Sequence, residues 1–174
     1  MNDEKEFYFQ DELRFGTRTD LGRRWIRGGV KAIGLQHIGY DYGYLSVAIN
    51  PLLGKIRMFI LPNMTRESFQ VFLDEFAKGL KSKVKLITDG ASSHRSQRLK
   101  IDEKIELEQI PAYSPELNPV ERFFQEIRKQ LKNKVFSTYE EVEQAVIEIA
   151  KPYLKDRKTV KQITCYDWLV KAPT

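Results

Sequence analysis

Three carboxylates in this 174-residue chain, Asp11, Asp89 and Glu121, have the residue type and placement to do metal chemistry. Asp11 interrupts an alternating apolar row in FYFQDELRFG, residues 7–16, where an uncompensated charge would cost roughly several kcal/mol to desolvate. Asp89 follows the short apolar run VKLIT, and Glu121 lies near the start of an amphipathic stretch. Carboxylates brought together can bind a divalent cation, so these positions point to metal-assisted chemistry on a phosphate-containing substrate.

Each of these carboxylates also has an ordinary structural explanation. Asp11 could lie on a strand edge or at a bulge that faces water. Asp89 with Gly90 is a common turn dipeptide. Glu121 lies three residues after Asn118, where a glutamate can bond back to the N-cap amide and complement the helix dipole. The case for a site therefore depends on where the chain places the three together.

The strands that would position them follow from hydrophobic periodicity. Alternating or continuous apolar runs predict a strand over 7–16, a hairpin over 40–49 and 55–61, and strands over 84–88 and 105–110. Residues 14–32 have no sustained period and predict a long connection or an irregular hairpin.

The helices follow from apolar residues spaced three and four apart. The first would begin after Thr65 as its N-cap, the second would have Asn118 as N-cap and Pro119 as its first residue, and the third would begin at a capping box, Ser137 to Glu140.

Two further segments are less regular. A helical turn is expected around residues 93–100, and the chain beyond Pro152 predicts a basic, largely exposed connection. The apolar residues Tyr166, Trp168 and Leu169 would dock a C-terminal piece onto the body.

The predicted strands bring the carboxylates together if the first and fourth strands are neighbours. Asp11 and Asp89 would then converge at one end of the sheet, where open α/β folds place their ligands, and a nearby helix N-terminus would add Glu121. Like charges at that distance raise one another's pKa, and a divalent cation resolves the conflict. All-oxygen ligation favours Mg²⁺ or Mn²⁺, the ions of two-metal phosphoryl transfer.

The motifs DELRFG, TDGASSH and YSPELNPVERFF together resemble the DDE transposases of bacterial insertion sequences in the mariner superfamily, over about residues 5–150. The resemblance implies an α/β, ribonuclease H-like mixed five-stranded sheet with flanking helices. It implies a catalytic domain over residues 1–155 and a C-terminal extension over 156–174. It also implies that Asp11, Asp89 and Glu121 bind Mg²⁺ or Mn²⁺, as two ions.

The function implied by this resemblance is a transposase that cleaves DNA at element ends and joins the freed 3′ hydroxyl to target DNA at a TA dinucleotide. A stand-alone ribonuclease H-like nuclease is the alternative within enzymes, and a non-catalytic DNA-binding remnant is the alternative outside them. Such transposases usually carry an N-terminal helix-turn-helix region, yet here the first strand is expected almost at Met1. A separate or fused helix-turn-helix domain is therefore an expected partner, as are DNA and a second copy of the chain.

Several other side chains are candidates for contact with DNA or its phosphates. Ordinary solvated faces and core packing explain them nearly as well. The candidates are His94, Arg122, Arg128, Lys129, Lys132 and, beside Trp25 in the arginine-rich connection, Arg24. Glu12 would face the opposite side of the strand from Asp11 and is expected to be structural.

Composition is compatible with these expectations. The chain has 29 Lys and Arg against 24 Asp and Glu, a net charge of +5 that suits a polyanionic partner without requiring one. One cysteine, Cys165, and two histidines exclude an internal disulfide and a structural zinc site. The charged N-terminus does not resemble a signal peptide and no apolar run reaches membrane-spanning length, which favours a cytoplasmic, nucleoid-associated bacterial protein.

Overall fold

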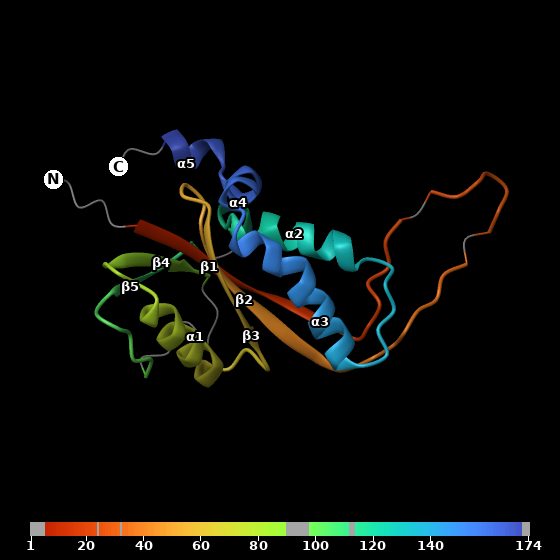
Figure 1. Ribbon diagram of the computed structural model, residues 1–174, viewed down its shortest axis with the longest axis horizontal. Helices are drawn as coiled ribbons and strands as arrows, with labels where there is room; N and C mark the ends of the chain where they lie inside the picture. The colour runs from red at the N-terminus through yellow and green to blue at the C-terminus, as the bar shows by residue number, and fades with distance from the viewer. Residues whose placement is uncertain (1–5, 24, 32, 90–97, 112–113, 172–174) are drawn as a thin grey trace.

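A single mixed sheet organises the chain, for which the computed structural model describes residues 6–23, 25–31, 33–89, 98–111 and 114–171. Its strand order is β3-β2-β1-β4-β5 (Figure 1). The strands are β1 Glu6–Gly16, β2 Tyr42–Asn50, β3 Lys55–Leu61, β4 Val84–Thr88 and β5 Ile105–Gln109. β1, β2 and β3 pair antiparallel, while β1, β4 and β5 pair parallel.

This topology confirms the ribonuclease H-like mixed five-stranded sheet with flanking helices. It also confirms that the first and fourth strands are neighbours, because β1 lies between β2 and β4. The first strand is therefore central, and the explanation of Asp11 as a residue of an edge strand is wrong.

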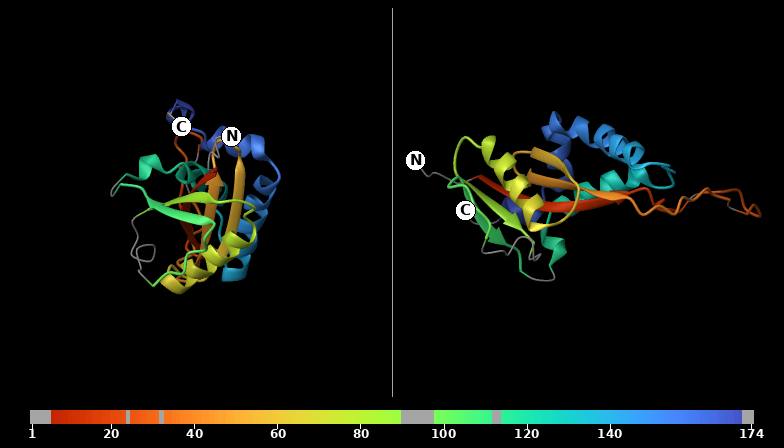
Figure 2. Two further views of the ribbon diagram at one scale, coloured as in Figure 1. Left: turned by 90° about the vertical axis from the view of Figure 1, so that its left-hand side faces the viewer. Right: turned by 90° about the horizontal axis from the view of Figure 1, so that it is seen from below.

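Helices cover both faces of the sheet (Figures 1 and 2). α1 packs against one face together with Tyr8, Ala48 and Leu86, and α2, α3 and α4 pack against the other together with Phe9 and Leu13. The helices are α1 Arg66–Lys78, α2 Val120–Leu131, α3 Tyr139–Ala150, α4 Arg157–Thr164 and α5 Asp167–Lys171, with short 3₁₀ turns at Pro115–Leu117 and Lys151–Leu154. The alternation of side chains along β1 thus supplies two separate apolar cores.

The predicted helix starts are correct for α1 and displaced by one residue for α2 and α3. α2 begins at Val120 with Pro119 at its cap, although the Asn118 Oδ1 still accepts a hydrogen bond from the Val120 amide at 3.1 Å. α3 is capped by Thr138 in place of Ser137. Ser137 and Thr138 are each followed three residues later by a glutamate, so the sequence offers a capping box at both positions and does not decide between them.

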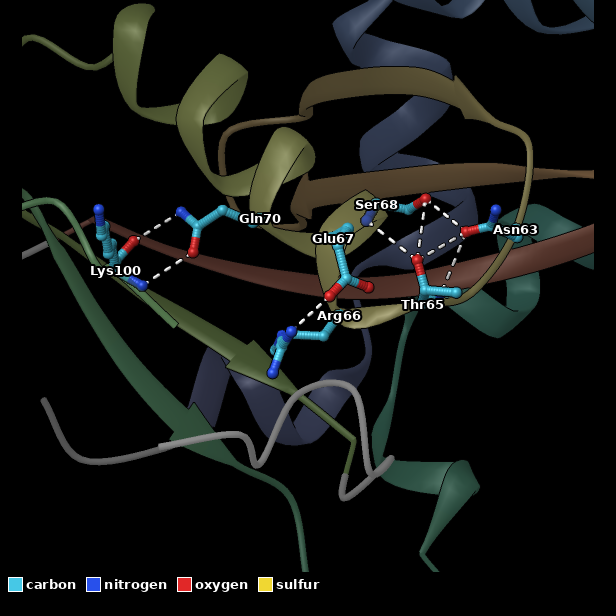
Figure 3. Close-up of polar contacts among 7 residues, drawn as sticks. All are labelled: Asn63, Thr65, Arg66, Glu67, Ser68, Gln70 and Lys100. Atoms are coloured by element: carbon cyan, nitrogen blue, oxygen red, sulfur yellow. Dashed lines mark hydrogen bonds and ion pairs between the residues drawn. The ribbon is translucent and has the colours of Figure 1, made fainter. Parts of the chain in front are cut away.

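The first turn of α1 is held by a cluster of short polar side chains (Figure 3). Thr65 Oγ1 accepts a hydrogen bond from the Ser68 amide at 3.3 Å. The Asn63 Oδ1 accepts from the Thr65 hydroxyl at 2.8 Å and from the Ser68 hydroxyl at 2.6 Å (Figure 3). The cluster therefore stabilises this helix start, and Glu67 adds a negative charge to the first turn.

The segment beyond Pro152 is basic and largely exposed, as predicted, but it is a helix and not an irregular connection. Residues 157–164 form α4, whose N-cap Asp156 accepts from the Thr159 amide at 3.0 Å, and Val160 is fully buried in the core beneath α2 and α3. This helix has only two apolar residues, Val160 and Ile163, which are too few to show a helical period in the sequence. Leu169 is buried in the same core, as the predicted docking of the C-terminal piece requires.

The connection between β1 and β2 forms a long arm, residues 17–41, that projects from the end of the sheet (Figures 1 and 2). Backbone hydrogen bonds from Thr17 to Asp41 and from Thr19 to His37 close its base. Asn133, at the end of α2, ties the base to the body through bonds to Asp20 and Gly22. None of the described arm residues belongs to either apolar core.

Candidate active site

The register of β1 against β4 places Asp11 and Asp89 together. Phe9 stands opposite Ile87 in this parallel pair. Asp11 lies two residues further along β1, and Asp89 lies two residues after Ile87, directly past the end of β4. Since side chains alternate between faces, both aspartates continue the face of Phe9 and Ile87, the face covered by α2. Neighbouring strands are about 4.8 Å apart, so the two carboxylates converge where β4 ends.

Burial and like charge dominate the electrostatics of Asp11. Burial raises the pKa of Asp11 to about 7, and the neighbouring charges of Glu12, Glu121 and Asp89 act in the same direction. A hydrogen bond from the Glu12 amide to Asp11 Oδ1 at 2.8 Å opposes them in part. Asp11 is thus a carboxylate whose negative charge is poorly compensated by the protein, which is the condition a bound cation would relieve.

Glu121 lies in the first turn of α2, near enough to Asp11 for its charge to act on that carboxylate. Its amide donates to the Asn118 carbonyl at 3.2 Å, and its carboxylate accepts from Arg128 at 3.3 Å, about two turns further along the helix. Both side chains of that ion pair are more than a third exposed, so the pair contributes little to stability. The capping-box explanation for Glu121 is not realised in its side-chain contacts, because the carboxylate faces Arg128.

Asn118 connects the two elements that carry Asp11 and Glu121. Its Nδ2 donates to the Gln10 carbonyl at 3.1 Å and lies 3.4 Å from Asp11 Oδ2, while its Oδ1 accepts from the Val120 amide. The side chain is only 2% exposed. Sequence reasoning assigned Asn118 a capping role alone, because its contact with Asp11 spans 107 residues and leaves no local pattern.

A second polar group supports β1 from the opposite face. Gln10, fully buried, donates through Nε2 to Glu12 Oε1 at 2.6 Å and to Ser46 Oγ at 3.2 Å. Glu12 therefore faces away from Asp11 and contributes to the structure of the strand, as predicted. The backbone of residues 10–12 is held from both sides of the sheet.

The described residues do not already form a metal cage. Among them, no three carboxylate, imidazole or thiolate side chains stand close enough together to hold an ion. The donor set of Asp11, Asp89 and Glu121 nevertheless fits Mg²⁺ or Mn²⁺, because it consists of carboxylate oxygens around a buried, poorly compensated charge.

The basic residues predicted along α2 have varied surroundings. Arg128 pairs with Glu121, Lys129 pairs with Glu126 at 2.5 Å, and Arg122 stacks over the Tyr166 ring with its guanidinium carbon 3.8 Å from the centroid. Lys132, at the C-terminal end of α2, is exposed. Three of these four cations already have partners within the chain, and their contact with DNA stays a prediction.

Other predicted contacts lie elsewhere. Arg24 and His94, together with most of the turn expected at 93–100, lie outside the described residues. Trp25 lies in the arm with its whole side chain exposed, so the alternative of a core tryptophan is wrong.

The raised pKa of Asp11 predicts a pH-dependent stability in the metal-free protein. The carboxyl titrates at about 7 when folded and at 3.8 otherwise, so between these values the folded state binds more protons. The free energy of unfolding should therefore fall as pH rises from 4 to 7, by up to about 1.4 kcal/mol per pH unit. Urea denaturation in chelator at four pH values, compared with Asp11→Asn, isolates this contribution. A wild-type minus Asp11→Asn difference that stays constant with pH would contradict it.

None of the helices in the described ranges has both the length and the apolar composition needed to cross a bilayer.

Comparison with known proteins gives a family and a fold. A family model described as DDE superfamily endonuclease matches residues 6–143. The uncharacterized protein y4pE/y4sA of Sinorhizobium fredii is 34% identical over 104 residues, which cover 58% of this chain and 77% of that protein.

Solved structures show the same fold at low sequence identity. The Mos1 mariner paired-end complex with Mn superposes with a TM-score of 0.65 at 17% identity, over 90% of this chain and 53% of that chain. The catalytic domain of Mos1 mariner transposase gives 0.56 at 16% identity, over 90% and 78%. The chain thus spans about half the length of the Mos1 chain in the paired-end complex.

Proposed function

Because the chain belongs to the DDE superfamily endonuclease family, we propose that it is the catalytic domain of a DNA transposase that cleaves DNA at element ends and joins the 3′ hydroxyl to target DNA. The observation that carries this proposal is the convergence of Asp11 and Asp89 on one face at the end of β4, with α2 bringing Glu121 into electrostatic contact. The similarity to the Mos1 transposase structure supports the assignment of the fold that would carry out this chemistry.

We propose Asp11, Asp89 and Glu121 as the metal ligands, for two Mg²⁺ or Mn²⁺ ions. Structures of Mos1 paired-end complexes with Mn and with Mg are consistent with this choice of ions. Bound there, the ions would supply activation of the attacking water or hydroxyl and neutralise charge on the phosphate undergoing transfer. The chain's own contribution is to bring the charges of Asp89 and Glu121 near Asp11 and to shield the Asp11 carboxylate partly from water.

DNA is the proposed partner. The net charge of +5 favours association with its phosphates, and the exposed Lys132 together with Arg122 offers basic side chains on the helix that carries Glu121. A paired arrangement of two copies on DNA, and a helix-turn-helix module fused or separate, would complete a transposase of the Mos1 kind, whose chain is about twice as long as the part matched here. Such a protein would act in the bacterial cytoplasm at the nucleoid.

The domain boundary is proposed at about residue 155. Helices α4 and α5 follow it and place Val160 and Leu169 in the same apolar core as α2 and α3. The proposed C-terminal extension, residues 156–174, thus contributes apolar side chains to the core of the catalytic domain.

The test is nicking of a supercoiled plasmid by the purified chain in Mn²⁺, with and without chelator. We expect metal-dependent conversion to the open circle, because phosphoryl transfer by carboxylate-held ions needs the metal at each step. A second assay then asks whether a pre-cleaved oligonucleotide end becomes joined to plasmid.

Three results separate the possibilities. Nicking with joining supports a transposase, and nicking without joining supports a stand-alone nuclease. DNA binding with an identical salt dependence in Mn²⁺ and in chelator, and without nicking, would contradict the proposal and favour a non-catalytic DNA-binding remnant.

A further inference from the structure

We propose that Asn118 is a positioning residue that fixes the Asp11 carboxylate and the start of α2 in the arrangement that receives the metal ions. The inference rests on the proposed function and adds to it a residue that touches none of the reacting atoms. Its basis is the set of four short contacts that Asn118 makes between β1 and α2.

The amide of Asn118 can satisfy these contacts in one orientation only. Its oxygen must face the Val120 amide, which is a donor, and its nitrogen then faces two acceptors, the Gln10 carbonyl and Asp11 Oδ2. Aspartate at this position would have no donor for those acceptors, and serine would be too short to reach β1. Asparagine is the residue that both begins the helix and donates to the strand.

The Asp11 carboxylate is thereby held at both oxygens. Oδ1 accepts from the Glu12 amide at 2.8 Å and Oδ2 lies 3.4 Å from Asn118 Nδ2. A carboxylate offers about four acceptor positions, so these two donors limit its rotation and still leave lone pairs on both oxygens for a cation. Residues that orient a ligand in this way commonly change metal affinity about 10- to 100-fold when they are replaced.

The same residue links Asp11 to Glu121 through two different groups. The main-chain carbonyl of Asn118 accepts a hydrogen bond from the Glu121 amide at 3.2 Å, while the Asn118 side chain donates to the main-chain carbonyl of Gln10, the residue preceding Asp11. Because only 2% of the Asn118 surface is exposed, water cannot easily replace either contact. The elements that carry the two carboxylates are therefore joined at one buried residue, whose side chain supplies the contact with β1.

The experiment measures Mn²⁺ binding in the absence of DNA, by the electron paramagnetic resonance signal of the free ion. Asn118→Ser is the informative variant, because its hydroxyl can still cap α2 but cannot reach Gln10 or Asp11. We expect Asn118→Ser to bind Mn²⁺ about tenfold more weakly than the wild type, and the Mn²⁺ concentration for half-maximal nicking to rise in parallel. Asn118→Ala should lose the cap as well and unfold at a lower temperature than Asn118→Ser.

A matched control comes from Asn63, the other asparagine whose side-chain oxygen holds a helix start (Figure 3). Asn63→Ala should lower the unfolding temperature while leaving Mn²⁺ affinity within about twofold of the wild type, since α1 packs on the opposite face of the sheet.

The outcomes distinguish the positioning role from the proposed function. If Asn118→Ser is folded and binds Mn²⁺ within twofold of the wild type, the positioning role is wrong while the metal site stands. If the wild type binds no Mn²⁺, or Asp11→Asn binds it equally well, the proposed site fails and the role of Asn118 fails with it.

Discussion

Asp89→Asn is expected to reduce Mn²⁺-dependent nicking by roughly a thousandfold. The carboxylate lies where β4 ends, two residues past the position that pairs with Phe9, and amide replacement removes a negative oxygen from the proposed ligand set. Metal-assisted charge stabilisation supplies several kcal/mol to phosphoryl transfer, and each loss of about 1.4 kcal/mol lowers the rate tenfold. The measurement is the initial rate of open-circle formation from supercoiled plasmid at saturating Mn²⁺.

Asp74→Asn provides the matched control for this prediction. Asp74 is an exposed aspartate on α1, where it accepts a hydrogen bond from Gln70, and α1 lies across the sheet from the carboxylates. Its replacement should leave the nicking rate within about twofold. Equal nicking rates for the wild type and Asp89→Asn, with both proteins folded, would show that Asp89 is not one of the metal ligands.

Phe123→Ala is expected to lower the free energy of unfolding by about 3–5 kcal/mol. Phe123 lies on the buried face of α2 and is fully buried. Its ring packs edge to face against the Tyr153 ring at a centroid distance of 5.1 Å and also packs against Phe124. Its removal leaves a cavity under the helix that carries Glu121, so the proposed site should loosen together with the core. Urea denaturation at constant pH measures the change.

Gln125→Ala tests whether that loss reflects burial. Gln125 is exposed on the same helix, and alanine is a strong helix former, so the change in unfolding free energy should stay within about 0.5 kcal/mol. A loss below about 1.5 kcal/mol for Phe123→Ala would show that the core beneath α2 closes around the missing ring.

Local patterns predicted the strands and the faces of the site well. The alternation of Phe9, Asp11 and Leu13 fixes which side of β1 carries the carboxylate, because side chains alternate strictly along a strand. The same periodicity, with the neighbouring fourth strand, predicted where Asp89 would lie. These features need only short-range information and one assumption about strand order.

Contacts between residues far apart in the sequence, and elements with weak local patterns, could not be predicted from the sequence. The contact of Asn118 with Asp11 depends on how α2 docks against β1, which no spacing encodes. Ser137 and Thr138 are each followed three residues later by a glutamate, so either could cap α3, and Val160 with Ile163 gave too short an apolar pattern to reveal α4. The pairing of Glu121 with Arg128 likewise follows from packing at the helix surface.

The arm between β1 and β2 has a consequence for how this chain can evolve. Because its described residues add nothing to either apolar core and its base is closed by a few hydrogen bonds, insertions, deletions and substitutions beyond the base carry little thermodynamic penalty. Folding stability therefore places little constraint on exposed apolar residues of the arm such as Trp25 and Ile33.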